Sequence, residues 1–217
     1  MNIPVAGQTL KLFPEKATFW MEEKTLVISD LHIGKITHFR KEGVAIPSTG
    51  IKNNFERLDQ LLLNNNAWRI IFTGDLFHSD HNYEWEIFCE WRAKYHSVDM
   101  HIVKGNHDRL PDYCYDDLQV HEKELNVSPF TFTHHPREKI KSDEFIIAGH
   151  IHPVIRLVDR AGHSFRFPCF HFSKQQLILP SFGYFTGGYV IQPSEQETVI
   201  AIVKDQLMDV SSVFSSE

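Results

Sequence analysis

The sequence is poor in cysteine and has no long apolar run. Its three cysteines among 217 residues are scattered and form no C-x-x-C pair, a pattern typical of reduced thiols rather than a disulfide framework or a thiolate zinc site. No stretch of about 18 apolar residues occurs, which argues against a membrane-spanning helix. The N-terminal residues 1–16 contain no apolar core of a signal peptide. We therefore expect a cytoplasmic protein without a membrane partner.

The sequence also lacks an excess of basic residues. Its 22 Lys and Arg residues against 28 Asp and Glu residues give a net charge of −6, which argues mildly against a nucleic-acid partner. Internal repeats, low-complexity tracts and flexible linkers are absent, so we expect one domain over residues 1–217. Hydrophobic residues make up 42% of the chain, which suffices for a core without disulfides. Histidine is abundant, with 14 residues, and several of them lie beside Asp, Asn or Gly.

The hydrophobic pattern predicts alternating strands and helices, followed by a region of strands. Apolar residues from Ile51 to Leu62 recur at helical spacing after the candidate N-cap Ser48. A second helix is expected over 83–95, and its apolar side chains occur most of the way round, which predicts burial on two sides. We expect strands at 10–13, 17–20, 25–29, 70–72, 100–103, 130–133, 145–148, 165–167, 177–179, 189–192 and 198–203. This order predicts an α/β protein with a pair of mixed sheets.

Five of these strands end at polar residues that can bind metal ions. The segments are Asp30-Leu31-His32, Gly74-Asp75, Gly105-Asn106-His107-Asp108, His134-His135 and Gly149-His150-Ile151-His152. In an extended segment residues i and i+2 point the same way, so His150 and His152 can aim into one pocket. The glycines before Asp75, Asn106 and His150 allow tight turns and close backbone approach. Because ligands bind outside the strand ends of open α/β sheets, we expect these segments to converge.

The side chains of these segments form a candidate ligand set for divalent ions. Carboxylate and amide oxygens mixed with imidazole suit Mn²⁺, Fe²⁺ or Zn²⁺ in five- or six-coordinate sites. Seven ligands are too many for one ion that keeps open positions, but they fit two ions if one carboxylate bridges. Each motif alone has an ordinary alternative, such as a surface turn. The pair His134 and His135 also fits one core residue beside one exposed residue.

These motifs resemble those of the calcineurin-like metallophosphoesterases across residues 30–152. The chain is most similar to the bacterial DNA-ligase-associated metallophosphoesterase family through DLHIGKITHFR (30–40), GDLFHS (74–79), GNHDR (105–109), GHIHP (149–153), FPCF (167–170) and LPSFGYFTGG (179–188). The resemblance implies a four-layer α/β/β/α sandwich with two mixed sheets. It also implies a dinuclear centre, for which Mn is our first choice and Fe or Zn are the alternatives.

The resemblance also implies the role of each residue. One ion is expected on Asp30, His32, Asp75 and His152. The second is expected on Asp75, Asn106, His150 and either His134 or His135; we favour His134 because it directly follows its strand. His107 would contact the phosphate and protonate the leaving oxygen, and Asp108 would orient its imidazole. The alternative for Asp108 is that it caps the next turn.

The family resemblance predicts hydrolysis of phosphodiesters, with DNA as the substrate, by an endonuclease of the DNA damage response. A DNA ligase, a helicase and an exonuclease are the partners that it implies. We expect Arg40, Arg109 and His78 to contact the substrate, since they lie close to the ligand segments. One alternative is a phosphatase or pyrophosphohydrolase of a nucleotide or small ester; another is a non-catalytic protein-binding scaffold. The oligomeric state is left open.

Overall fold

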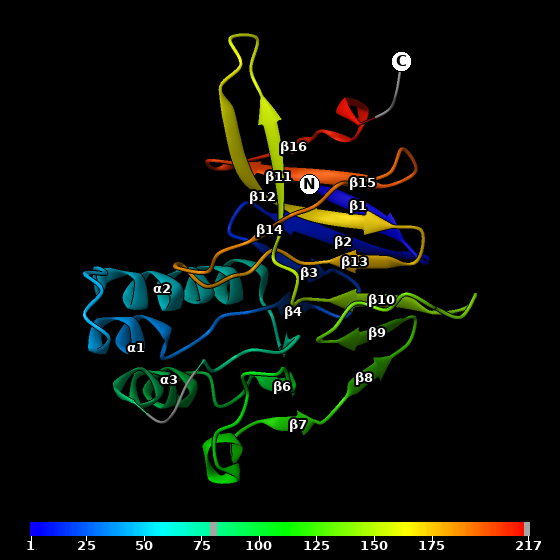
Figure 1. The fold of residues 1–217 in the computed structure, drawn as a ribbon. Coiled ribbons are helices and arrows are strands. Elements are labelled where there is room, and N and C mark those ends of the chain that lie inside the picture. Colours follow the sequence, from blue (N-terminus) through cyan, green and yellow to red (C-terminus); the bar gives the residue numbers. More distant parts are fainter. Residues whose placement is uncertain (79–81, 215–217) are drawn as a thin grey trace.

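The computed structural model describes residues 1–78 and 82–214, which form two packed sheets (Figure 1). Ser79, at the end of the motif 74–79, lies outside the described residues. The first sheet is mixed: its first four strands pair antiparallel and its last four pair parallel. Its order is β1 (Asn2–Val5), β2 (Gln8–Phe13), β3 (Ala17–Trp20), β4 (Thr25–Ile28), β5 (Arg69–Phe72), β6 (Asp99–Val103) and β7 (Gln119–His121).

The second sheet is also mixed and comes from the C-terminal half of the described chain. Parallel pairs join β9 to β10 and β10 to β13, and antiparallel pairs join most of the others. Its strands are β8 (Glu124–Val127), β9 (Phe130–Thr133), β10 (Phe145–Ala148), β11 (Pro153–Val158), β12 (Ser164–Ser173), β13 (Gln176–Ile178), β14 (Tyr189–Val190), β15 (Thr198–Val203) and β16 (Gln206–Asp209). The two mixed sheets confirm the predicted α/β architecture.

Alternation of side chains along the central strands builds two separate cores. Leu26 and Ile28 of β4 face helices α1 (Lys35–Lys41), α2 (Thr49–Asn65) and α3 (Tyr83–Lys94), whereas Val27 faces the second sheet. Successive residues of a strand point to opposite faces, so continuous apolar runs mark strands that are buried on both sides. The three helices therefore cover the outer face of the first sheet, as Figure 1 shows.

Aromatic residues fill the core between the two sheets. Trp20 of the first sheet meets Phe130 of the second edge-to-face, with ring centroids 4.8 Å apart. Both side chains are almost fully buried. Truncation of such a ring to alanine costs about 3–5 kcal/mol of unfolding free energy. This packing fixes the distance between the two sheets, and the predicted ligand segments lie at the strand ends of both.

Two expectations about the helices need correction or refinement. Helix α3 buries Glu84, Phe88 and Trp91, and leaves Trp85, Ile87 and Cys89 half-buried, so the prediction of burial on two sides is wrong. The second expectation is the outer helical layer on the second sheet. On that side the short 3-10 turn Ser211–Val213 lies beside β15, and all three α-helices of the described chain fall within residues 35–94. In that described part, none of the helices has the length and apolar character needed to cross a membrane.

Candidate metal centre

The predicted ligand segments leave their strands at the same end of the two sheets. Asp30 and His32 follow β4, Asp75 follows β5, His134 follows β9, and His150 follows β10. Asp30, His32, Asp75, His150 and His152 all have left-handed backbones, with φ between 48° and 67°. Such conformations are uncommon outside glycine and cluster at functional sites, because the surrounding structure must hold them. Here they turn each side chain out of its strand toward a shared centre.

Two glycines let the segments approach more closely than any side chain allows. A Cβ atom at Gly105 would lie 2.2 Å from an oxygen of Asp75, and one at Gly149 would lie 1.6 Å from the hydroxyl of Ser29. Neither position therefore tolerates a larger residue without displacement of Asp75 or of the residues around Asp30. This contact explains why glycine precedes Asn106 and His150 in the sequence.

The first group of candidate ligands is the inner cluster, which comprises Asp30, His32 and His152. One ligand atom of each lies within 4.8 Å of the others. Nε2 of His152 is 3.0 Å from Oδ1 of Asp30. Two ligands at right angles around an ion, with bonds of about 2.1 Å, are about 3 Å apart. The inner cluster therefore has the spacing of a metal site.

The second group is the outer cluster, which comprises His134, His135 and His150. Nε2 of His134 lies 3.1 Å from Nδ1 of His150 and 3.1 Å from Oδ1 of Asn106. His134 is only 2% exposed, whereas His135 is an exposed residue. Both histidines lie in the cluster, but His134 also reaches Asp75. The geometry thus supports His134 as the ligand and leaves His135 beside it.

Asp75 lies between the two clusters. Its Oδ2 is 3.5 Å from Nε2 of His134 and 3.9 Å from Nε2 of His32. Burial raises the pKa of Asp75, but the neighbouring His134 imidazole and the hydrogen bond from the backbone N–H of His107 outweigh burial and hold this pKa below its usual range. Asp75 is therefore an anion at neutral pH, in the position that a bridging carboxylate requires.

Several buried polar atoms of this centre make no hydrogen bond within the described chain. Both ring nitrogens of His32 are among them, and Oδ1 of Asp30 and Nε2 of His152 face only each other, 3.0 Å apart. Buried polar atoms without partners are costly, and metal coordination is one way to satisfy them. Burial also lowers the pKa of His32 to about 2, so its imidazole is neutral, as a metal ligand must be. The residues present therefore fit divalent ions.

Backbone carbonyls set the orientation of two of these imidazoles. Nδ1 of His134 lies 3.0 Å from the carbonyl oxygen of Thr73, and Nδ1 of His152 lies 3.1 Å from that of Gly187. A carbonyl can only accept, so Nδ1 carries the proton in both rings and Nε2 is free to bind an ion. Sequence reasoning missed these two partners, because a backbone carbonyl has no signature in the sequence.

His107 and His78 lie side by side at the edge of the inner cluster. Their rings stack with centroids 4.9 Å apart, and both rings meet the ring of His32 edge-on. The backbone N–H of His107 donates to Asp75. Burial, with the charges of Lys35 and His107, lowers the pKa of His78 to about 4. His78 is therefore a neutral group at neutral pH, next to the predicted proton donor.

Asp108 does not have the environment expected of a residue that orients His107. One carboxylate oxygen accepts from the N–H of Phe77 and the other from the N–H of Gly105. Burial raises its pKa to about 7. No hydrogen bond to His107 occurs in the described part of the chain, so that prediction needs correction. Asp108 instead ties together the two turns that carry Asp75 and Asn106, which is close to the alternative of a turn cap.

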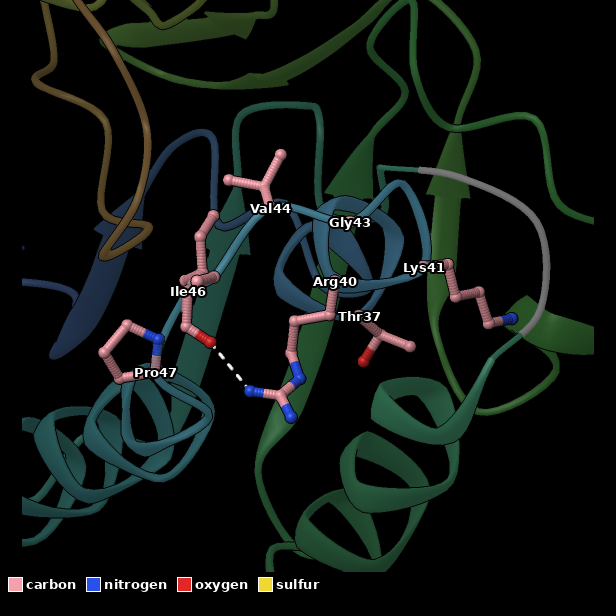
Figure 2. A pocket seen from close by; sticks show the side chains of 8 residues that line it. Thr37, Arg40, Lys41, Gly43, Val44, Ile46 and Pro47 are labelled. Carbon is pink, nitrogen blue, oxygen red and sulfur yellow. Dashed lines mark hydrogen bonds between the residues drawn. The ribbon is translucent and has the colours of Figure 1, made fainter.

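Arg40 lies away from the two clusters. Its guanidinium donates to the carbonyl oxygen of Ile46, 2.8 Å away, at the end of α1 (Figure 2). The surrounding cavity of about 720 Å³ is lined by Thr37, Arg40, Lys41 and residues 43–47, and by none of the candidate ligands. The prediction that Arg40 contacts substrate assumed that a short separation in sequence places a side chain at the site. On helix α1, His38 and Phe39 contact the ring of His78, whereas Arg40 is turned toward Ile46.

Arg109 stays close to the site but is exposed. Its Nε donates to the backbone carbonyl of Asn106, 2.7 Å away. Glu84 was missed by the sequence analysis, although it is 3% exposed and accepts from the N–H groups of Gly34 and Thr37. This carboxylate fixes the start of α1 directly after the His32 segment. The same helix carries Glu86 and Glu90, so nothing in the sequence singled out Glu84.

Comparison with known families identifies the class of this protein. The family model of the calcineurin-like phosphoesterases matches residues 23–178. That range contains all the candidate ligands, and the chain therefore belongs to the calcineurin-like phosphoesterase family. Members of this family bind pairs of divalent metal ions, and the chain is accordingly a metal-dependent hydrolase of phosphate esters. A comparison with curated proteins found no match.

Solved structures give a more particular likeness. The chain is similar to the nuclease MPE of Pseudomonas putida, with 28% sequence identity, a TM-score of 0.80 and coverage of 97% of this chain and 99% of that one. It also matches Yfce, a phosphoesterase from E. coli, with 14% identity, a TM-score of 0.47 and coverage of 86% and 98%. The second likeness is too distant to carry an argument about function.

Proposed function

We propose that this protein is a two-ion phosphodiesterase that cleaves DNA. The observation that carries the proposal is the convergence of the inner and outer clusters on Asp75, in a chain that aligns over nearly its whole length with a nuclease. One ion is assigned to Asp30, His32, Asp75 and His152. The other is assigned to Asp75, Asn106, His134 and His150.

A cleft beside the outer cluster supports a substrate larger than a free phosphate. A cavity of about 480 Å³ is lined by Asn106, His134, His135 and the segments 104–105, 122–124, 133 and 136–137. Within it, Lys104 pairs with Glu122 and Arg137 pairs with Glu124. With Lys123, which also lines the cavity, three cations stand against two carboxylates, and the cleft carries one net positive charge. The cleft therefore suits a phosphodiester, whose scissile phosphate carries one negative charge.

The side chains around the centre have distinct roles in the proposed reaction. Bound divalent ions supply positive charge at the phosphoryl oxygens and acidify the water that attacks phosphorus. His107 donates a proton to the departing oxygen, and the backbone bond from its N–H to Asp75 holds it at the centre. His78 packs flat on this imidazole and limits its rotation. We assign Arg109, which donates to the carbonyl of Asn106, to the phosphate next to the scissile one.

The choice of manganese, a role in DNA repair and a cytoplasmic location belong to the same proposal. They rest on the sequence resemblance to the DNA-ligase-associated family, as does cooperation with a ligase, a helicase and an exonuclease. The ligand set itself accepts Mn²⁺, Fe²⁺ and Zn²⁺, because all three bind imidazole and carboxylate. Metal analysis of protein purified without added metal tests the choice of ion.

Cleavage assays with four substrates test the proposed activity. Metal-free protein is supplied with Mn²⁺ and offered plasmid DNA, single-stranded DNA, a bis-aryl phosphate and an aryl monophosphate. We expect cleavage of DNA and of the bis-aryl diester, with loss of both in Asp75→Asn. Activity confined to the monophosphate would contradict the nuclease and support a phosphatase. Full binding of two ions without any hydrolysis would support the scaffold alternative.

A further inference from the structure

The segment 181–189 contacts both ends of the inner cluster, although none of its side chains is a candidate ligand. The hydroxyl of Ser181 donates to the carbonyl oxygen of Asp30, 2.8 Å away, and the N–H of Gly183 donates to the same oxygen. The carbonyl oxygen of Gly187 lies 3.1 Å from Nδ1 of His152, and the N–H of Tyr189 donates to the carbonyl of His152. One stretch of nine residues therefore holds two ligands of the same proposed ion.

These two ligands come from different sheets. Asp30 follows β4 of the first sheet, and His152 lies between β10 and β11 of the second. Their relative position thus depends on how the two sheets sit against each other. A metal site needs its ligand atoms within about 0.2 Å of their ideal distances. The segment 181–189 contacts both Asp30 and His152, and these contacts supply this precision.

Arg57 of α2 anchors this segment from the opposite side. Its Nη2 donates to the carbonyl oxygen of Phe182, 2.5 Å away, and its guanidinium lies 4.0 Å from the centre of the Phe182 ring. Asn54 and the backbone carbonyl of Glu15 accept from the same guanidinium. Phe182 is fully buried, and its own N–H donates to the carbonyl of Ser29. In Figure 1 the orange segment between β13 and β14 runs beside α2.

We propose that Arg57 is a positioning residue for the ion held by Asp30, His32 and His152, and that it acts through the segment 181–189. This inference rests on the ligand assignment of the proposed function. Arg57 fixes Phe182, the neighbouring Ser181 and Gly183 fix Asp30, and Gly187 fixes His152. Residues that orient metal ligands from outside the ligand set typically change metal affinity by 10–100-fold when removed. Arg57 is one step further out, so we expect a change of about tenfold.

Calorimetric titration with Mn²⁺ alone tests the inference without any substrate. Wild-type protein stripped of metal is expected to bind two ions. Arg57→Met should bind one of them about tenfold more weakly and keep the other. Arg57→Lys should recover part of the loss, because it retains one donor. Ser181→Ala, which removes a single bond to Asp30, should weaken the same ion to a smaller degree.

Arg69→Met is the matched control. Like Arg57, Arg69 combines a polar contact of its guanidinium, here an ion pair with Asp99, with an aromatic contact, here with Trp68. It lies at the start of β5, at the other end of that strand from Asp75. We expect Arg69→Met to lower thermal stability while both Mn²⁺ affinities stay at the wild-type value. An equal loss of Mn²⁺ affinity in Arg57→Met and Arg69→Met would overturn the inference, since it would reflect general destabilisation.

A double variant identifies which ion is affected. In the background of His32→Ala, which removes a ligand of the inner cluster, Arg57→Met should cause no further loss of Mn²⁺ affinity. Turnover of Arg57→Met should return to near the wild-type kcat at saturating Mn²⁺. Wild-type binding of both ions by Arg57→Met and Ser181→Ala would refute the positioning role of Arg57 and leave the ligand assignment intact. Failure of the wild-type chain to bind two ions would instead refute the ligand assignment as well.

Discussion

The inner and outer clusters hold similar ligands in different ways. In the inner cluster, Asp30 and His32 are buried, and the segment 181–189 braces the cluster from behind. In the outer cluster, the exposed His135 packs on His150 with ring centroids 4.1 Å apart, and the group faces a cavity of about 480 Å³. Ligands that are buried and held in place lose little conformational entropy when an ion binds. Ligands that face solvent exchange their ion more readily, and the ion there can contact the substrate. We therefore expect one tight ion and one weaker, substrate-facing ion.

The largest expected effect comes from Asp75, the residue that both clusters share. Asp75→Asn keeps the size of the side chain but removes the charge that lies between His32 and His134. We expect the loss of at least one ion and a fall in kcat of about 10³-fold or more. Calorimetry with Mn²⁺ and a diesterase assay measure the two quantities. Wild-type turnover by Asp75→Asn would contradict a bridging role.

Removal of one histidine from each cluster tests whether the inner and outer clusters bind their ions independently. His32→Ala should abolish the tighter of the two Mn²⁺ binding events, because it removes a buried ligand. His150→Ala should leave that event intact and weaken the other by about 10–100-fold or more. Manganese titrations of both variants, side by side, measure the difference. Equal losses at both sites in both variants would mean that the clusters act as one unit.

His107 should affect turnover rather than metal binding. His107→Ala is expected to retain both ions and to lose about 10²–10⁴-fold in kcat with a poor leaving group. The loss should be smaller with a nitrophenyl leaving group, which departs without a proton. The readout is the dependence of kcat on the leaving-group pKa. Loss of an ion in this variant would show that His107 has been assigned the wrong role.

Asp108→Asn is the matched comparison for His107. Its carboxylate ties two turns together through the N–H groups of Phe77 and Gly105. An amide replaces one accepting oxygen with a donor that faces a backbone N–H, which costs about 1–3 kcal/mol of unfolding free energy. Urea unfolding measures this change. We expect Asp108→Asn to keep the wild-type dependence of kcat on the leaving-group pKa. Loss of that dependence would show that Asp108 orients His107 in catalysis after all.

The smallest effect is expected at Arg40, which lies outside both clusters. Among residues 1–78 and 82–214, removal of its guanidinium in Arg40→Ala breaks one hydrogen bond, to the carbonyl of Ile46. We expect the KM for single-stranded DNA to stay within about twofold of the wild-type value, as is usual for exposed positions without a functional contact. A rise of the KM by an order of magnitude would place the cavity of Figure 2 on the substrate path.

The sequence predicts the candidate ligands well because the relevant signals are local. Polar residues such as Asp30 and Asp75 interrupt apolar runs that are buried on both sides, and glycine marks the points of close approach. The parallel strands β4, β5 and β6 then place these ends along one edge. A local signal of this kind needs only the strand boundaries, and those were correct to within a residue or two for β4, β5 and β10.

The rest of the site depends on contacts that no local sequence pattern encodes. The direction of Asp108 follows from the turn it stabilises, and the position of Arg40 follows from the path of α1. The partners of His134 and His152 are backbone carbonyls, to which every residue type contributes equally. The motif 179–188 was visible in the sequence, but its contact with Arg57 joins residues 125 positions apart. Only the three-dimensional structure brings these together.

Anomalous diffraction from crystals grown with Mn²⁺ tests the central claim most directly. We predict two manganese peaks about 3.5–4 Å apart on either side of the Asp75 carboxylate. One should contact Asp30, His32 and His152, and the other Asn106, His134 and His150. A single peak, or a pair of peaks that Asp75 does not touch, would contradict the account.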